Sequence, residues 1–208
     1  CFARGTFLSG VLFKRCTIPA ARCPPHAACR RGRPIRANPI RATPDRVTPA
    51  CEYFGRCGGC SLQHLAPDAQ LAMKQATLLD SLARIASVAP EVLLAPVRGA
   101  NWGYRRKARL AVRHVERKGR VLVGFREAEK PWVVDMLSCA TADPAISRLI
   151  EPLSELIGRL SIRARLPQVE ATVADNATAL VFRVLDPPTP ADRDELREFA
   201  ASQAVRIY

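Results

Sequence analysis

Three cysteines near residue 50 have the residue type and spacing to bind a metal centre. Cys51, Cys57 and Cys60 are separated by five and then by two residues, so one tight loop would carry three thiol groups. Glycines at three positions of this loop would let the backbone fold around a bulky inorganic centre. Such a site needs a fourth ligand, and Cys139 is the one cysteine further along the chain.

The residue types leave the kind of metal centre open. Four thiolates suit either an iron-sulfur cluster or zinc, because both centres accept soft sulfur ligands. His64, four positions after Cys60, could also complete a zinc site with three thiolates. Unligated thiols are a third alternative. Disulfides among the eight cysteines are disfavoured, because we see no recognisable secretory signal and expect the cytoplasm, where thiols stay reduced.

The charge balance indicates a polyanionic partner, and nucleic acid is the first candidate. The chain has 32 Lys and Arg against 19 Asp and Glu, a formal net charge of +13. Residues 1–50 hold ten of these cations and one acid, so about +9 of the charge lies there. No stretch reaches the ~20 apolar residues of a membrane span, so we expect no membrane partner, and we expect a monomer.

The composition divides the chain into three parts. Residues 1–43 are rich in Arg and Pro without helical or strand periodicity, which predicts a disordered basic arm. An RNA-binding tail, a transit peptide and an atypical N-terminus are the alternative interpretations of this arm. Residues 44–66 form the cysteine loop, and residues 67–208 a central domain. Because the chain begins at Cys1 and ends within a predicted strand, we expect a fragment.

The central domain is predicted to have an α+β fold of antiparallel hairpins, with flanking helices around the cysteine loop. Alternation of apolar and polar residues predicts strands at 107–115, 121–126, 132–134, 169–174 and 179–185, with a last strand from 205. Helical signals predict helices from 67 to before Pro90, from Asp143 to Leu160 with a division near Pro152, and from Thr189 to about 202.

The first helix carries an apolar stripe that we expect to lie in the core. Its members fall on one helical face, and they are Leu71, Leu78, Leu79, Leu82 and Ile85.

A basic run at residues 104–109 could contact RNA. It combines the aromatic ring of Tyr104 with the cations Arg105, Arg106, Lys107 and Arg109. Alternation along a strand would place Arg105, Lys107 and Arg109 on one side, where they could follow a phosphate backbone. The alternative is an ordinary solvated face of a sheet.

The segment from Cys51 to His64 resembles the cluster motif of bacterial 23S ribosomal RNA (uracil-5)-methyltransferases of the RlmD type. The resemblance extends over about residues 43–208. It includes Asn101–Leu110, Val123–Arg126, Val134–Asp135 and Cys139, in the order of that family. It implies a [4Fe-4S] cluster on Cys51, Cys57, Cys60 and Cys139. It also implies 23S ribosomal RNA as the partner and adds Arg126 to the RNA-binding residues of the basic run.

The resemblance further implies a reaction whose catalytic parts we do not find in this sequence. Members of the family methylate uracil C5 with S-adenosylmethionine, after a cysteine thiolate has added to C6. That chemistry belongs to a Rossmann-like domain, and we find no Gly-rich cofactor loop here; residues 186–188 read as a turn. We therefore predict no catalytic residues and no activity of this chain alone. A zinc-binding RNA-binding module without enzymatic function is the alternative. The strand pattern of the family's N-terminal OB-like barrel is also missing from residues 1–42.

Overall fold

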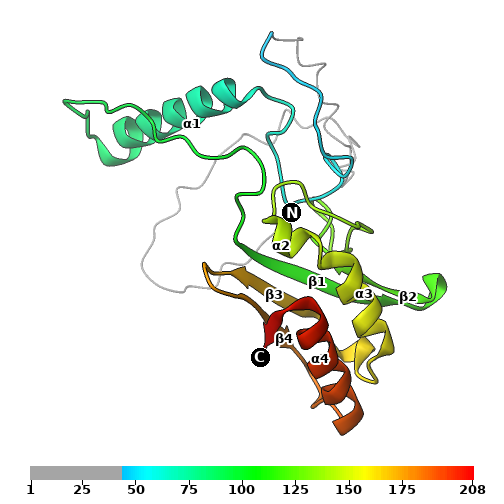
Figure 1. Ribbon diagram of the computed structural model, residues 1–208. Coiled ribbons are helices and arrows are strands. Elements are labelled where there is room, and N and C mark those ends of the chain that lie inside the picture. The colour runs from blue at the N-terminus through cyan, green and yellow to red at the C-terminus, as the bar shows by residue number, and fades with distance from the viewer. Residues whose placement is uncertain (1–43) are drawn as a thin grey trace, which may run out of the picture. The chain divides into compact units, whose positions relative to one another are not determined.

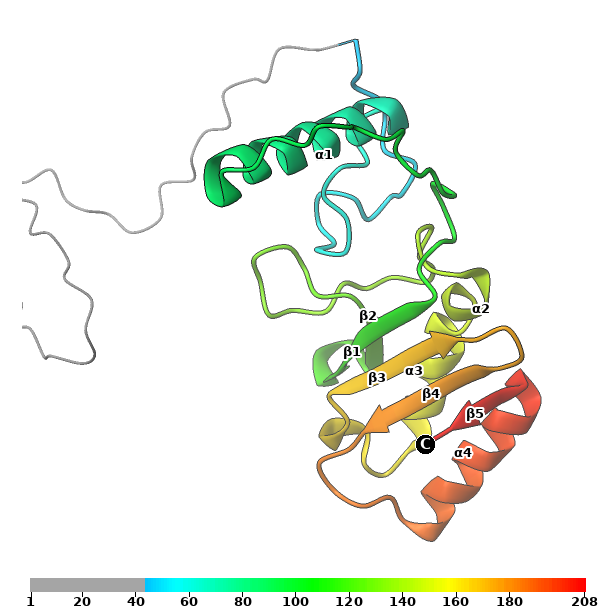
Figure 2. The ribbon, with the colours of Figure 1, turned by 90° about the vertical axis from the view of Figure 1, so that its left-hand side faces the viewer.

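A five-stranded sheet organises the part of the protein that the computed structural model describes, residues 44–208 (Figures 1 and 2). The arm predicted at residues 1–43 lies outside the described residues. The strands are β1 (Lys107–Val115), β2 (Arg120–Gly124), β3 (Gln168–Val173), β4 (Thr178–Arg183) and β5 (Val205–Ile207). Their order in the sheet is β2-β1-β3-β4-β5.

The predicted hairpins are confirmed, although the sheet as a whole is mixed. β1 pairs with β2, and β3 pairs with β4, each antiparallel, and β1 joins β3 antiparallel at the centre. β5 pairs with β4 in parallel, because α4 carries the chain back to the same end of the sheet. The turn between β1 and β2 ends at Gly119, whose φ of +63° suits glycine.

The prediction of a strand at residues 132–134 is wrong. This segment makes one isolated bridge between Val133 and Arg126, and it stays outside the sheet. Two backbone hydrogen bonds hold it, from Glu127 N to Trp132 O at 2.8 Å and from Val134 N to Phe125 O at 2.9 Å. The chain turns at residues 128–132 between the two paired segments, so the pairing goes no further in that direction.

Two of the three helices after the hairpin, α2 and α4, begin where the sequence predicts. Asp143 caps α2 (Pro144–Ser147) by accepting a hydrogen bond from Ala145 N at 2.9 Å. The helical stretch is then divided, and α3 (Ile150–Arg159) has Pro152 in its first turn, where no N–H is needed. α4 (Pro190–Gln203) begins with a capping box formed by Thr189 and Asp192.

The core lies between the apolar face of the sheet and α3, which lies behind the sheet in Figure 2. Alternate residues of the strands point to this side, and α3 contributes a stripe at helical spacing. The strands contribute Ala108, Leu110, Val112, Val121, Val123, Val169, Ala171 and Leu180, and the helical side contributes Ile146, Leu149, Ile150, Leu153, Leu156, Ile157 and Leu160.

The first helix forms as predicted, but the prediction that its apolar stripe is core is wrong. α1 (Pro67–Ser81) continues into the π-helical turn Leu82–Ala86, and neither contains a buried residue. Leu78 is 57% exposed and Ile85 is 85% exposed. Helical periodicity identifies an apolar face, but it does not say what packs against that face. In residues 44–208 no element buries it.

Candidate metal centre

The four cysteines predicted as ligands line one small cavity. Cys51, Cys57 and Cys60 come from the loop at 44–66, and Cys139 comes from the segment that leads into α2. Phe54, Phe125 and Met136 also line this cavity, which gives it a largely apolar wall. All four cysteines are free thiols. The fold therefore brings together thiol groups that lie about 80 residues apart in the chain.

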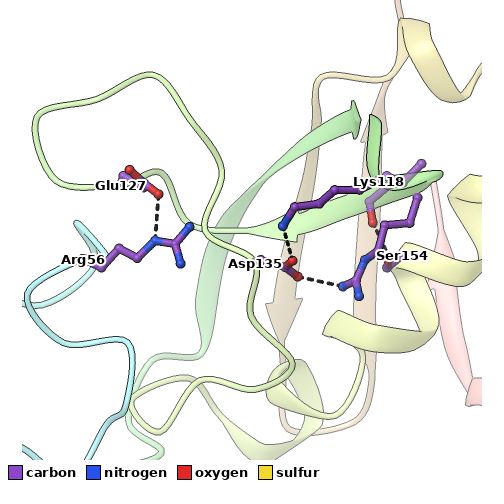
Figure 3. Close-up of polar contacts among 7 residues, drawn as sticks. Arg56, Lys118, Glu127, Asp135 and Ser154 are labelled. Atoms are coloured by element: carbon purple, nitrogen blue, oxygen red, sulfur yellow. Dashed lines mark hydrogen bonds and ion pairs between the residues drawn. The ribbon is translucent and has the colours of Figure 1, made fainter. Parts of the chain in front are cut away.

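Backbone pairing holds the cysteine loop against the end of the β1–β2 hairpin. Gly58 N donates to Arg126 O at 2.9 Å, and Ala128 N donates to Arg56 O at 2.9 Å. A side-chain ion pair between Arg56 and Glu127, with Nε 2.8 Å from Oε1, reinforces this pairing (Figure 3). The Arg56 guanidinium holds the pKa of the Glu127 carboxyl below its usual value, so the pair stays ionised at neutral pH. The backbone of Arg126 thus supports the loop.

A second set of contacts places the chain that leads to Cys139. Asp135 accepts from Lys118 Nζ at 2.6 Å and from Arg120 Nη2 at 2.8 Å, which ties this chain to the β1–β2 hairpin (Figure 3). The hydrogen bond from Lys118 lowers the pKa of the Asp135 carboxyl. Cys139 N then donates to Ser147 Oγ at 2.9 Å, so α2 also fixes the cysteine.

Two glycines of the loop lie where an added Cβ would make tight contacts. A Cβ on Gly59 would lie 3.3 Å from Cys57 Sγ and 3.5 Å from the Phe125 ring. A Cβ on Gly58 would lie 3.1 Å from the backbone oxygen of Arg126. The expectation that glycine lets the backbone approach the site is therefore supported by the packing around both residues.

Two hydrogen-bonding groups lie beside three of the four sulfur atoms. Gly59 N donates to Cys57 Sγ at 3.3 Å. Thr141 is buried, and its Oγ1 lies 3.4 Å from Cys139 Sγ and 3.6 Å from Cys60 Sγ. Donors in these positions would stabilise thiolate sulfur, which is the form that ligates metals. Sequence reasoning missed Thr141, and its position two residues after Cys139 is the one signal that could have indicated it.

The electrostatics of the cavity oppose four free thiolates. Burial raises the pKa of the Cys57 thiol, and the nearby Cys139, Cys60 and Cys51 raise it further, although the Gly59 N–H acts in the opposite direction. Four thiolates can coexist here only with a positive centre among them. In residues 44–208, no three Cys, His, Asp or Glu side chains converge closely enough to hold a single metal ion as they stand. The thiols therefore surround a common space without closing on one point.

His64 does not share this space. Its ring lies beside Phe54, with the ring centroids 5.8 Å apart, and it is absent from the lining of the cysteine cavity. The arrangement thus favours Cys139 over His64 as the fourth ligand.

Arg105 is not on the strand with the other predicted RNA contacts. β1 begins at Lys107, and Arg105 reaches back to the cysteine loop, where its Nη2 donates to Gly59 O at 3.0 Å. Its guanidinium also lies 5.2 Å from the centroid of the Phe125 ring. The prediction that alternation groups Arg105 with Lys107 and Arg109 is wrong, because the strand does not extend to Arg105.

The remaining predicted RNA-binding residues lie on the surface in different surroundings. Lys107 and Arg109 are exposed on β1, and Arg106 pairs with Asp175 at 2.7 Å. Arg126 is exposed. Tyr104 is 53% exposed and lines a hollow of about 900 Å³ next to Cys60, together with Trp102. The RNA-binding role of these residues stays a prediction.

Among the helices of residues 44–208, none combines the length and the apolar character that a membrane-spanning helix requires.

Sequence comparison relates the chain to one group of RNA-modifying enzymes. It is 52% identical over 158 residues to the 23S rRNA (uracil(1939)-C(5))-methyltransferase RlmD of Ralstonia nicotianae, a match that covers 76% of this chain and 35% of that enzyme. The same enzyme from Thiobacillus denitrificans is 51% identical over 158 residues, with 76% and 37% covered. The enzyme from Cupriavidus necator is also 51% identical over 158 residues, with 76% and 36% covered.

The chain thus spans about a third of the length of the curated relatives it matches. No protein-family model matches the chain. Among solved structures, a Pyrococcus abyssi tRNA (uracil-54, C5)-methyltransferase in complex with S-adenosyl-L-homocysteine aligns with a TM-score of 0.48 and 25% identity, covering 74% of this chain and 36% of that one. The resemblance read from the cysteine motif and the segments after it is confirmed by these sequence matches.

Proposed function

The chain belongs to the family of RlmD-type 23S rRNA (uracil-C5)-methyltransferases over the three quarters of its length that match them, and from this premise we propose its function. We propose that it is the part of such an enzyme that holds a [4Fe-4S] cluster and binds 23S ribosomal RNA. The observation that carries the proposal is the cavity at which four thiols from two distant segments meet.

The residues around the cavity fit a cluster of this kind. A [4Fe-4S] cluster takes four thiolates, and its cationic iron core would offset the charge repulsion that these thiolates create when they are close together. Cys51, Cys57, Cys60 and Cys139 would hold the cluster. Gly59 N–H and the Thr141 hydroxyl would donate to its sulfur ligands.

The role of the cluster in this proposal is to fasten two segments together. The loop at 44–66 is connected to the chain between β2 and Cys139 by backbone hydrogen bonds, by the Arg56–Glu127 ion pair and by the hydrogen bond from Leu137 N to Tyr53 Oη at 3.2 Å. Four metal-ligand bonds would add a much stronger connection at the same place. The loop surface beside the basic run would then have one fixed shape for RNA.

Methyl transfer is assigned to the portion of such enzymes outside the matched third. The family's reaction needs a cysteine nucleophile, and each of the four cysteines in residues 44–208 lines the proposed cluster cavity. S-adenosylmethionine would accordingly bind in that other portion. We propose that the 208-residue chain alone binds ribosomal RNA without methylating it.

The test uses the full chain, purified under anaerobic conditions, with a transcript of the 23S rRNA region that contains the uridine named for the relatives. We expect binding that weakens when the cluster is removed by a chelator and oxidant, and we expect no transfer of labelled methyl groups from S-adenosylmethionine. RNA binding that is equal with and without the cluster would refute its shaping role. Methyl transfer by the chain alone would refute the assignment of methyl transfer to the other portion of the enzyme.

A further inference from the structure

The side of the sheet that α3 does not cover is exposed and strongly basic. Besides Lys107 and Arg109 of the basic run, it carries cations from outside residues 104–109. We define the basic sheet face as Lys107, Arg109, Arg113, Arg183 and Arg206, with Glu170 as its one acid. We propose that this face binds the sugar-phosphate backbone of RNA over several consecutive phosphates. The inference rests on the proposed function, and it assigns a surface to the RNA that the function requires.

The strand registers place these residues side by side. Across the sheet, Lys107 on β1 faces Thr172 on β3, which faces Ala179 on β4, and Ala179 faces Arg206 on β5. The next two rows are Arg109, Glu170 and Val181, and then Ala111, Gln168 and Arg183. Arg113 follows Arg109 along β1 by four residues and so points to the same side. The alternate residues of β1 that point to the other side, Ala108, Leu110 and Val112, are buried.

At the centre of the face, the carboxylate of Glu170 contacts both Arg183 and Arg109. Arg183 Nε donates to it at 3.0 Å, and Arg109 Nε lies 3.7 Å from the same oxygen. The hydrogen bond from Arg183 lowers the pKa of Glu170, and the charges of Arg109 and Lys107 add to that effect. These contacts use the Nε atoms of the two arginines. Their terminal Nη groups therefore remain available to a phosphate, and the two side chains are 70% and 63% exposed.

The size of the face suits a polymer and exceeds what a single small anion needs. Alternate residues of a strand lie ~7 Å apart and neighbouring strands ~4.8 Å apart, so the cations spread over about 14 Å by 20 Å. Five cations against one acid leave a net charge of +4 on this area. Such a surface can neutralise several phosphates of one backbone.

The chemistry of the face favours backbone contact over base recognition. The strands β1, β3 and β4 place no aromatic side chain on the face, and Tyr208, which follows Arg206 by two residues and is 69% exposed, is an aromatic ring at its edge. Unpaired bases stack on aromatic rings and on Arg guanidinium planes, and two exposed rings, Tyr104 and Trp102, lie together next to the cysteine loop. The face would position the RNA, and sequence recognition would occur elsewhere.

The test compares two triple variants of the full chain with equal net charge. The first, Lys107→Gln with Arg113→Gln and Arg206→Gln, removes cations of the face for which the structure gives no ion pair within residues 44–208. The control, Arg117→Gln with Arg148→Gln and Arg193→Gln, removes three exposed arginines of the 116–118 turn, the end of α2 and α4, for which it likewise gives none. Both retain Glu170 and its arginine partners. Circular dichroism melting checks that both variants are folded.

Binding to the 23S rRNA transcript is measured from 50 to 300 mM salt. We expect the face variant to reduce the slope of log K against log salt by about 2 and to weaken binding about 100-fold at 0.1 M salt, at ~0.7 in slope per phosphate contact. The control should stay within threefold of the unaltered chain. In the unaltered chain, RNA should also protect Lys107 from acetylation.

The outcomes of this experiment distinguish a failure of the proposed function from a failure of the RNA-binding role of the basic sheet face. Failure of the unaltered chain to bind the transcript would overturn the proposed function and remove the basis of this inference. Normal binding by the unaltered chain with equal loss in both triple variants, or with no loss in either, would overturn the inference alone. Lys107 that stays reactive while RNA is bound would also overturn it, and would assign the face to a protein partner instead.

Discussion

Replacing Arg105 with alanine should loosen the cysteine loop selectively. The guanidinium connects two segments, because it donates to Gly59 O at 3.0 Å and lies 5.2 Å from the centroid of the Phe125 ring. A hydrogen bond from a charged donor contributes about 1.5–3 kcal/mol, and a cation–π contact at a partly exposed site contributes about 0.5–1 kcal/mol. Because the two contacts share one side chain and are partly solvated, we expect a combined loss of about 2–3 kcal/mol.

Hydrogen exchange of the loop amides measures this loss directly. The amides of Cys57 and Gly58 are hydrogen-bonded, to Tyr53 O at 2.8 Å and to Arg126 O at 2.9 Å, and they exchange only when the loop opens. A loss of 2–3 kcal/mol raises the population of the open loop about 30- to 150-fold, and exchange of these amides should accelerate by that factor. Amides in β3 should exchange at the unaltered rate.

The matched control is Arg106→Ala. Arg106 is the next residue, and its side chain makes an exposed ion pair with Asp175 at 2.7 Å, away from the cysteine loop. Exposed ion pairs contribute about 0–1 kcal/mol, so loop exchange should change less than about fivefold. If Arg105→Ala and Arg106→Ala had the same small effect on the loop amides, the positioning role of Arg105 would be refuted.

Three further predictions concern the loop, α4 and α1. Gly59→Ala should lower the amount of iron bound per chain, since the added methyl group would press on Cys57 Sγ at 3.3 Å, and atomic absorption against the unaltered chain checks this. Asp192 is buried, which by itself raises its pKa, but hydrogen bonds from Ser161 and Thr189 outweigh burial and lower the pKa to about 2. Its stabilising contribution should be complete above about pH 5 and fall by about 2 kcal/mol as the pH drops to 2. Urea unfolding of Asp192→Asn, compared with the unaltered chain, should show a much weaker pH dependence over that range. Leu78→Ser and Ile85→Ser should each change the free energy of unfolding by less than about 0.5 kcal/mol, whereas Leu153→Ala should cost about 2–5 kcal/mol, and equal costs would mean that the α1 stripe is buried after all.

Local signals in the sequence predicted the elements whose stability is also local. The hairpins follow from strict alternation and a turn glycine, and the starts of α2 and α4 follow from Asp143 and Thr189, whose side chains cap their own helices. The parallel pairing of β5 was not predictable in this way, because it depends on where α4 returns the chain.

Predictions failed where the outcome depends on a partner distant in sequence. The α1 stripe has the right period for burial, yet residues 44–208 contain no surface that covers it. The alternation that grouped Arg105 with Lys107 assumed a longer strand, whereas a carbonyl 46 residues earlier in the chain accepts the hydrogen bond of Arg105. Thr141 and Asp135 support the candidate site through contacts that no local pattern indicates.

The prediction that the four cysteines share one site depended partly on a local signal and partly on a contact between distant segments. Spacing alone indicated three ligands on one loop and left zinc, His64 and Cys139 as open alternatives. The family resemblance selected Cys139, and the structure brings Cys139 to the same cavity as the three loop cysteines.

Metal and sulfide analysis of the full chain after anaerobic purification tests the central claim most directly. We predict about four irons and about four sulfides per chain, lost when Cys139 is replaced with serine and retained when His64 is replaced with alanine. One zinc per chain without sulfide, or a metal content that depends on His64 and not on Cys139, would contradict the account.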